Sequence, residues 1–139
     1  MKQSPASDPT VFPKDRVPSI RRLMMPRDTN ALGTIFGGAI LAEIDLAAAI
    51  EAHKCHPSKL VTVAMDKVEF KQPVFVGDLV SFYTETTRIG RTSITAHVSV
   101  WAQRKFGGGT HVHVTEADVT MVAVDDQFQP TPIQRPPQK

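Results

Sequence analysis

The acidic residue Asp45 lies inside a largely apolar stretch of the sequence, AILAEIDLAAAIEAH, which covers residues 39–53. If this stretch is a helix, at about 100° per residue its apolar side chains cover almost the whole circumference. Asp45 then falls about 160° away from Glu43, among leucine and alanine side chains. A carboxylate that is buried there without a partner costs several kcal/mol. Two interpretations remain open: a structural partner compensates the charge, or Asp45 is a base that takes a proton from water.

The loop before this stretch, DTNALGTIFGG, contains three glycines, Gly33, Gly37 and Gly38. A glycine pair before a helix leaves N–H groups free at the positive end of the helix dipole, where they can stabilise a developing oxyanion. Asn30 adds an uncharged donor and acceptor to the same loop. An ordinary helix-start turn, with glycine for geometry and asparagine as a cap, explains the same residues.

Histidines and the single cysteine offer other chemistry. His53, Cys55 and His56 lie close together at the end of the predicted helix, but no second ligand group follows at zinc-finger spacing, so we expect no metal site. His111 and His113 alternate on one face of a predicted strand, which we expect to be exposed. The pattern indicates no role for His97.

The elements that must position these residues follow from the sequence pattern. Residues 39–53 predict one long helix, preceded by the glycine pair and stopped near Pro57. Glu43 and Glu51 are about 80° apart on it and could share a solvated strip. Five segments carry strand signals, and short turns are expected to join the last four: residues 19–25, 60–70, 79–88, 91–106 and 110–125. The pattern predicts an α+β fold, with a long helix packed against an antiparallel sheet. Because the helix is apolar all round, we expect the sheet to wrap it and a second subunit to cover the rest.

Composition limits the class of protein. The 139 residues, 41% of them hydrophobic, suit a single domain, predicted at residues 17–128, with a flexible arm at 1–16 and a flexible proline-rich tail at 129–139. A net charge of +2 is too small to indicate nucleic-acid binding. Cys55 alone cannot form a disulfide within the chain, and no apolar stretch is long enough to span a membrane. We therefore expect a cytoplasmic protein with no membrane partner.

Three stretches in combination are more specific than any single feature. MPRDTNALGTIFGGAILAEID, then VTVAMDKVEFKQPVFVGDLV, then GRTSITAHVSVW, resemble the hotdog-fold acyl-CoA thioesterases, in particular the YciA-like acyl-CoA hydrolases. The resemblance covers about residues 20–125. It implies a long central helix wrapped by a curved antiparallel sheet of about five strands. It also implies dimers with shared sites, which in many members associate further into hexamers as trimers of dimers.

The resemblance implies roles for individual residues. Asp45 matches the catalytic carboxylate, expected to be a general base on water or, as the lesser alternative, the nucleophile. Asn30 matches the loop asparagine that meets this carboxylate across the dimer interface. Gly38, with Gly37 beside it, matches the helix start that presents an N–H to the thioester oxygen. Thr62 stands where relatives have a polar residue near the aspartate.

Binding of coenzyme A is implied for a second group. Arg91, Thr92 and Ser93 match the segment along the pantetheine arm and the phosphates, and Arg88 and Lys71 are further candidate cations. No cofactor is implied, because CoA belongs to the substrate. The sequence departs from many relatives at Thr34, where they have an acidic residue, and at Gln72, where they have a basic one. Lys71 could replace the latter, although a shift of one residue in a strand reverses the face.

Two other functions fit the same fold. A hotdog hydratase or dehydratase needs a histidine paired with an acidic residue, and no histidine stands in the loop or in the first half of the helix. A non-catalytic acyl-CoA-binding or regulatory protein does not need both Asn30 and Asp45. The sequence therefore favours a thioesterase that releases a fatty acid and free CoA.

Overall fold

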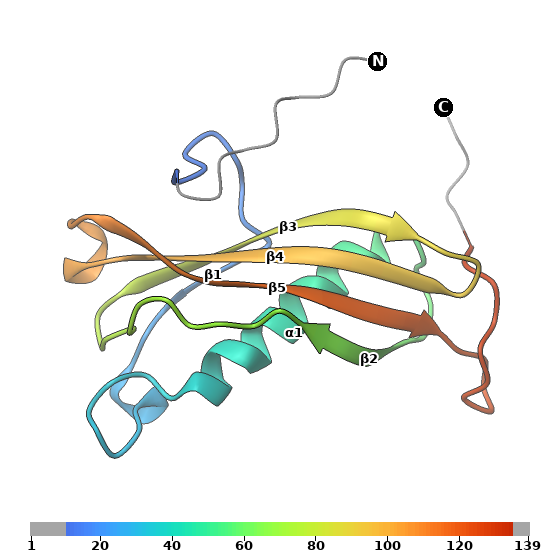
Figure 1. Ribbon diagram of the computed structural model, residues 1–139, viewed down its shortest axis with the longest axis horizontal. Helices are drawn as coiled ribbons and strands as arrows, with labels where there is room; N and C mark the ends of the chain where they lie inside the picture. Colours follow the sequence, from blue (N-terminus) through green and yellow to red (C-terminus); the bar gives the residue numbers. More distant parts are fainter. Residues whose placement is uncertain (1–10, 135–139) are drawn as a thin grey trace.

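The computed structural model describes residues 11–134 and has one helix packed against a curved five-stranded antiparallel sheet (Figure 1). The elements in chain order are β1 (Ile20–Leu23), η1 (Pro26–Asp28), α1 (Gly37–His53), β2 (Leu60–Asp66), β3 (Leu79–Ile89), β4 (Ser93–Gln103), η2 (Lys105–Gly107) and β5 (His111–Ala123). The predicted α+β class and the five strands are confirmed. No helix within the described residues has the length and apolarity to cross a membrane.

The helix begins two residues earlier than the sequence predicts. Phe36 is its N-cap, so Gly37 and Gly38 form the first turn rather than a preceding loop. The first turn tolerates glycine because its N–H groups have no partner within the helix in any case. The two glycines therefore present their N–H groups from the helix itself.

The strand order is β1-β3-β4-β5-β2, so the expectation that short turns join the last four strands is wrong for β2 and β3. β2 pairs with β5 at one edge, and the chain then crosses to the far side of β4 to begin β3. Lys67, with a φ of 62°, ends β2 before the predicted boundary at Phe70. β2 is thus an edge strand with one side open to another chain.

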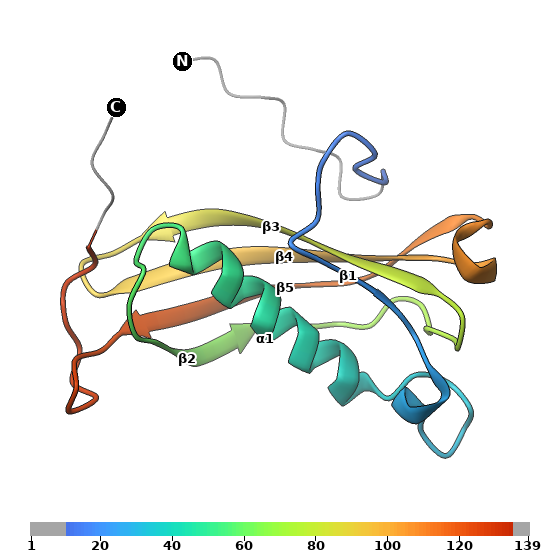
Figure 2. The same ribbon diagram turned by 180° about the vertical axis from the view of Figure 1, so that it is seen from behind.

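Figure 2 shows α1 lying against one face of the curved sheet, and the buried apolar side chains of both form the core between them. Ile40, Ile44, Ala47 and Ala48 of the helix are buried there. The opposite stripe of the helix is open, with Leu46 at 55% exposure and Ile50 at 45%. One sheet therefore covers only one side of the apolar helix, as the sequence predicts.

The two helix glutamates do not share a solvated strip, and this prediction is wrong. Glu43 pairs with Arg22 of β1 at 3.3 Å. Glu51 accepts hydrogen bonds from Thr84 and Thr86 of β3, at 3.0 and 2.9 Å. Both side chains are largely covered because the sheet supplies polar partners that the helix sequence does not reveal.

Both ends of the described chain contact the domain. Phe12 lies on the outer face of the sheet, where its ring stacks on His111 with 3.6 Å between ring centroids. At the other end, the backbone N–H of Gln134 donates to Nδ1 of the buried His56 at 2.9 Å. The division into arm, domain and tail stays a prediction, and residues 1–10 and 135–139 lie outside the described residues.

Candidate active site

Asp45 lies in the third turn of α1 and is half-buried. The hydroxyl of Thr62 donates to Oδ1 of Asp45 at 2.6 Å. Among the described residues Asp45 has no ion-pair partner, and Oδ2 accepts no hydrogen bond. The carboxylate is thus oriented by one neutral donor and keeps one oxygen free for a proton.

A β-bulge in β2 brings Thr62 to Asp45. The register of β2 against β5 shifts between Thr62 and Ala64. Leu60 before the bulge and Met65 after it both pack against the core. In a regular strand, residues five positions apart would point to opposite faces. Val63 and Met65 would share one face of such a strand, and the bulge breaks this alternation. Bulges are common beside active sites because they redirect side chains.

Asn30 organises the loop before the helix. Its Oδ1 accepts from the backbone N–H groups of Leu32 and Thr34, at 2.8 and 3.2 Å, and its Nδ2 donates to the Thr34 hydroxyl at 2.9 Å. Gly33 closes the loop with a φ of 87°, in the left-handed region that favours glycine. Asn30 makes no hydrogen bond with Asp45 of its own chain.

The start of α1 carries the candidate oxyanion donors. The N–H groups of Gly37 and Gly38 have no acceptor among the described residues. Gly38 and Asp45 are seven residues apart, which is about 10.5 Å along a helix. The free N–H groups at the helix start and the Asp45 carboxylate thus lie about two turns of α1 apart.

No sequence pattern indicates the ion pairs that hold the loop against the helix. Arg22 of β1 donates to Asp28 at 2.7 Å as well as to Glu43. Burial acts to raise the pKa of Asp28, but hydrogen bonds from the Met25 N–H and from Arg22 outweigh it and lower the pKa below its ordinary value of 3.8. Asp28 stands in the DTN stretch on which the resemblance rests, but only the fold shows that Arg22 meets it.

The candidate CoA-binding residues fall into two places. Arg91, Thr92 and Ser93 lie at the β3–β4 turn, and Arg88 near the end of β3 is exposed. Ser93 pairs with Val122 of β5, and Thr62 with the adjacent Met121, so this turn lies at the same end of the sheet as Asp45. β4 and β2 flank β5, which separates their backbones by about 10 Å.

Lys71 is not brought together with that turn. Its backbone N–H donates to the carbonyl of Val114, eight residues along β5 from Val122. Eight residues of a strand span about 27 Å. Lys71 and Arg91 of one chain therefore cannot hold the same phosphate.

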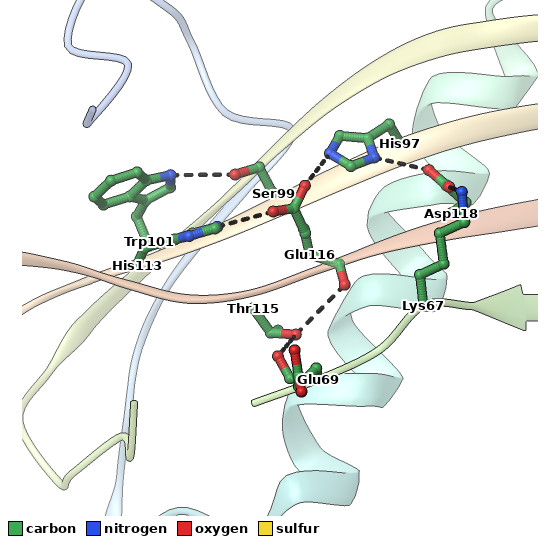
Figure 3. Close-up of polar contacts among 9 residues, drawn as sticks. All are labelled: Lys67, Glu69, His97, Ser99, Trp101, His113, Thr115, Glu116 and Asp118. Atoms are coloured by element: carbon green, nitrogen blue, oxygen red, sulfur yellow. Dashed lines mark hydrogen bonds and ion pairs between the residues drawn. The ribbon is translucent and has the colours of Figure 1, made fainter. Parts of the chain in front are cut away.

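A second polar cluster lies on the outer face of the sheet, away from α1 (Figure 3). His97 of β4 contacts Asp118 through Nδ1 at 2.7 Å and Glu116 through Nε2 at 2.9 Å. The ring of His113 stacks on Trp101 with centroids 4.9 Å apart, and burial lowers the pKa of His113 below its ordinary value of 6.5. The prediction that His111 and His113 share an exposed face is right for His111 and wrong for His113, which Trp101 covers.

The rings of the two histidines near the helix end have other partners. His53 contacts the carbonyls of Ala49 and Ser58, at 2.7 and 3.0 Å, and His56 accepts from Gln134. Among the described residues, no group of three or more His, Cys, Asp or Glu side chains is placed so that it could hold a metal ion. The expectation that the protein needs no metal stays a prediction.

Comparison with known proteins identifies the family. The model of the thioesterase superfamily matches residues 32–105. An uncharacterized acyl-CoA thioester hydrolase of Haemophilus influenzae is 40% identical over 118 residues, which cover 84% of this chain and 77% of that protein. Acyl-CoA thioester hydrolase YciA of Salmonella typhimurium is 38% identical over 116 residues, covering 82% of this chain and 87% of that protein.

A solved structure agrees with these relatives. Cj0915 of Campylobacter jejuni, a hexameric hotdog-fold thioesterase, matches with a TM-score of 0.78 and 47% identity, and the match covers 84% of this chain and 89% of that one. The chain therefore belongs to the thioesterase superfamily, and the predicted hotdog fold is confirmed.

Proposed function

We propose that the protein is an acyl-CoA thioester hydrolase, which converts acyl-CoA and water into a fatty acid and free CoA. The observation that carries the proposal is the half-buried Asp45 on α1, which is held by Thr62 and, unlike Glu43, has no cationic partner among the described residues. A structural carboxylate in such a place is expected to have an ion-pair partner. The relatives named as acyl-CoA thioester hydrolases support the same reaction.

In the proposed mechanism Asp45 is a general base. Its free Oδ2 takes a proton from a water molecule as the water oxygen bonds to the thioester carbon, while Thr62 fixes the other carboxylate oxygen. The C–S bond then breaks, and Asp45 returns the proton to the leaving thiolate. The products are a carboxylic acid and the free thiol of CoA. The proposed route needs no redox cofactor and no metal.

The carbonyl oxygen gains negative charge as the water attacks. The N–H of Gly38, with that of Gly37 beside it, is the proposed donor to this oxygen, since both are free of acceptors in the described chain. Such a donor contributes on the order of 10²–10³-fold to the rate. Asn30 is proposed to orient the water or to polarise the carbonyl, using donor capacity that its loop contacts leave free.

We further propose that the active unit is a homodimer with two shared sites, assembled into a trimer of dimers. Asn30 makes no hydrogen bond with Asp45 of its own chain, and the resemblance implies that these two residues meet across a dimer interface. The open edge of β2, the exposed Val63 on it, and the exposed Leu46 and Ile50 of α1 give a second copy an apolar surface to cover. Hexameric Cj0915 supports the larger assembly.

CoA is proposed to lie along the β3–β4 turn. Arg91 and Arg88 are exposed cations there, and Thr92 and Ser93 add hydroxyls for the phosphates or the pantetheine amides. Lys71 would reach the same CoA only from the other subunit. A cytoplasmic location remains part of the proposal, since acyl-CoA is an intracellular metabolite.

One assay separates this function from its alternatives. Purified protein is incubated with a panel of acyl-CoAs and a reagent that reports free thiols. The thioesterase releases CoA from saturated acyl-CoAs. A hydratase changes the absorbance of an enoyl-CoA without releasing thiol, and a non-catalytic acyl-CoA-binding protein does neither. Absence of thiol release from every acyl-CoA would contradict the proposal.

A further inference from the structure

Two aromatic rings flank the start of α1. The ring of Phe36 occupies the space where a Cβ atom on Gly38 would lie, and the nearest ring atoms of Phe70 are 3.7 Å from the corresponding position on Gly37. Both rings remain partly open, with exposures of 57% for Phe36 and 44% for Phe70. The two free N–H groups of the helix start are thus bordered by apolar surface.

The backbone on either side of each ring is fixed. The N–H of Phe36 donates to the Asp28 carbonyl at 2.7 Å, and its own carbonyl accepts from Ala39 at 2.9 Å. Next to Phe70, the carbonyl of Glu69 accepts from the buried hydroxyl of Thr115 at 2.8 Å, and the N–H of Lys71 donates to β5. These rings belong to a rigid wall, not to a loose loop.

The proposed oxyanion donors set where substrate must lie against this wall. A carbonyl oxygen within about 3 Å of the Gly38 nitrogen places both substituents of the thioester carbon within a few ångströms of the rings. One substituent is the sulfur, which continues into a pantetheine arm with two polar amides. The other is the acyl chain, whose methylenes gain free energy from contact with an aromatic ring, whereas amides lose hydration there.

We propose that Phe36 and Phe70 determine acyl-chain specificity, by forming the apolar wall on which the first methylenes of a straight acyl chain pack. The inference rests on the proposed thioesterase function. It also gives a second reason for glycine at position 38, besides the proposed oxyanion contact: any side chain there would displace the Phe36 ring. Acyl chains longer than acetyl are then preferred, and each methylene on the wall raises kcat/KM by up to about fourfold.

The test is the dependence of kcat/KM on chain length, measured with acetyl-, butanoyl- and hexanoyl-CoA. Phe36→Ala and Phe70→Ala should each lower the gain per methylene to below about twofold. Phe128→Ala is the matched control, since Phe128 is 69% exposed and follows β5 in the chain. The segment after β5 lies at the other end of the molecule from the start of α1 (Figure 1). The chain-length profile of Phe128→Ala should equal that of the wild type.

Other results overturn the inference. An unchanged profile in both alanine variants would show that the rings do not contact the acyl chain. An equal loss on all three substrates, with dissociation of the oligomer, would place the rings in a subunit interface instead. If Phe36→Ala does not fold, Phe36→Leu must still reduce the gain per methylene. Absence of thiol release by the wild type would refute the proposed function itself, whereas an active wild type with unchanged variants refutes only the wall.

Discussion

Replacement of Asp45 by asparagine separates a functional carboxylate from a structural one. Asparagine keeps the shape of the side chain, and its Oδ1 can still accept the hydrogen bond that Thr62 donates at 2.6 Å. The substitution removes only the charge and the ability to take a proton. Because a positioned general base contributes about 10²–10⁴-fold, we expect kcat to fall by about 10²-fold or more.

Stability should respond in the opposite way. Asp45 has no ion-pair partner among the described residues, so the substitution breaks no ion pair and leaves no buried charge unpaired. The free energy of unfolding of Asp45→Asn should therefore stay within about 1 kcal/mol of the wild-type value, or rise. Thiol release from acyl-CoA measures the rate, and denaturant unfolding of the same samples measures the stability.

Asp78→Asn is the matched control. Asp78 is 3% exposed, pairs with Arg104, and accepts the N–H of Phe75 at 2.9 Å. Breaking this buried pair should cost about 3–5 kcal/mol, with kcat per folded molecule retained. If Asp45→Asn behaved in the same manner, losing stability and keeping kcat, Asp45 would be structural and the mechanism would be refuted.

Three further outcomes are expected. Arg91→Ala should raise the KM for acyl-CoA more than it lowers kcat, because a charge far from the reacting atoms contributes mainly uniform binding. The effect should be smaller with a pantetheine thioester that lacks the nucleotide. Equal losses on both substrates would show that Arg91 is structural. Mixing inactive Asn30→Ala and Asp45→Asn subunits should restore about a quarter of wild-type activity. Half of the randomly formed dimers are mixed, and each mixed dimer has one intact site of its two. No recovery despite proven subunit exchange would contradict shared sites. Burial lowers the pKa of His113 below 6.5, so as the pH is lowered the unfolded chain binds the proton first and the free energy of unfolding decreases. His113→Phe should therefore lose less stability than the wild type between about pH 7.5 and pH 5.5. An unchanged dependence of stability on pH in denaturant unfolding would show that His113 does not contribute.

The sequence by itself determined the elements and the unusual carboxylate. The good helix formers around Asp45, with the glycine pair before them and Pro57 after them, predict α1 to within two residues of its start. β-Branched residues and alternation predict five strands, with errors mainly at their ends. These properties are local, because each depends on residues within a few positions along the chain. The resemblance added the hotdog fold, which the comparison with Cj0915 confirms.

Only the tertiary structure decided what meets the site. The bulge that turns Thr62 toward Asp45, the pair of Arg22 with Glu43, and the Phe70 ring beside Gly37 all join segments whose contact no local pattern encodes. The strand order was equally hidden, since alternation is the same for an edge strand as for a central one. The fold also decided which apolar side chains of α1 stay exposed. The sheet covers Ile40 and Ile44 and leaves Leu46 and Ile50 open, because a single sheet packs against only one side of a helix.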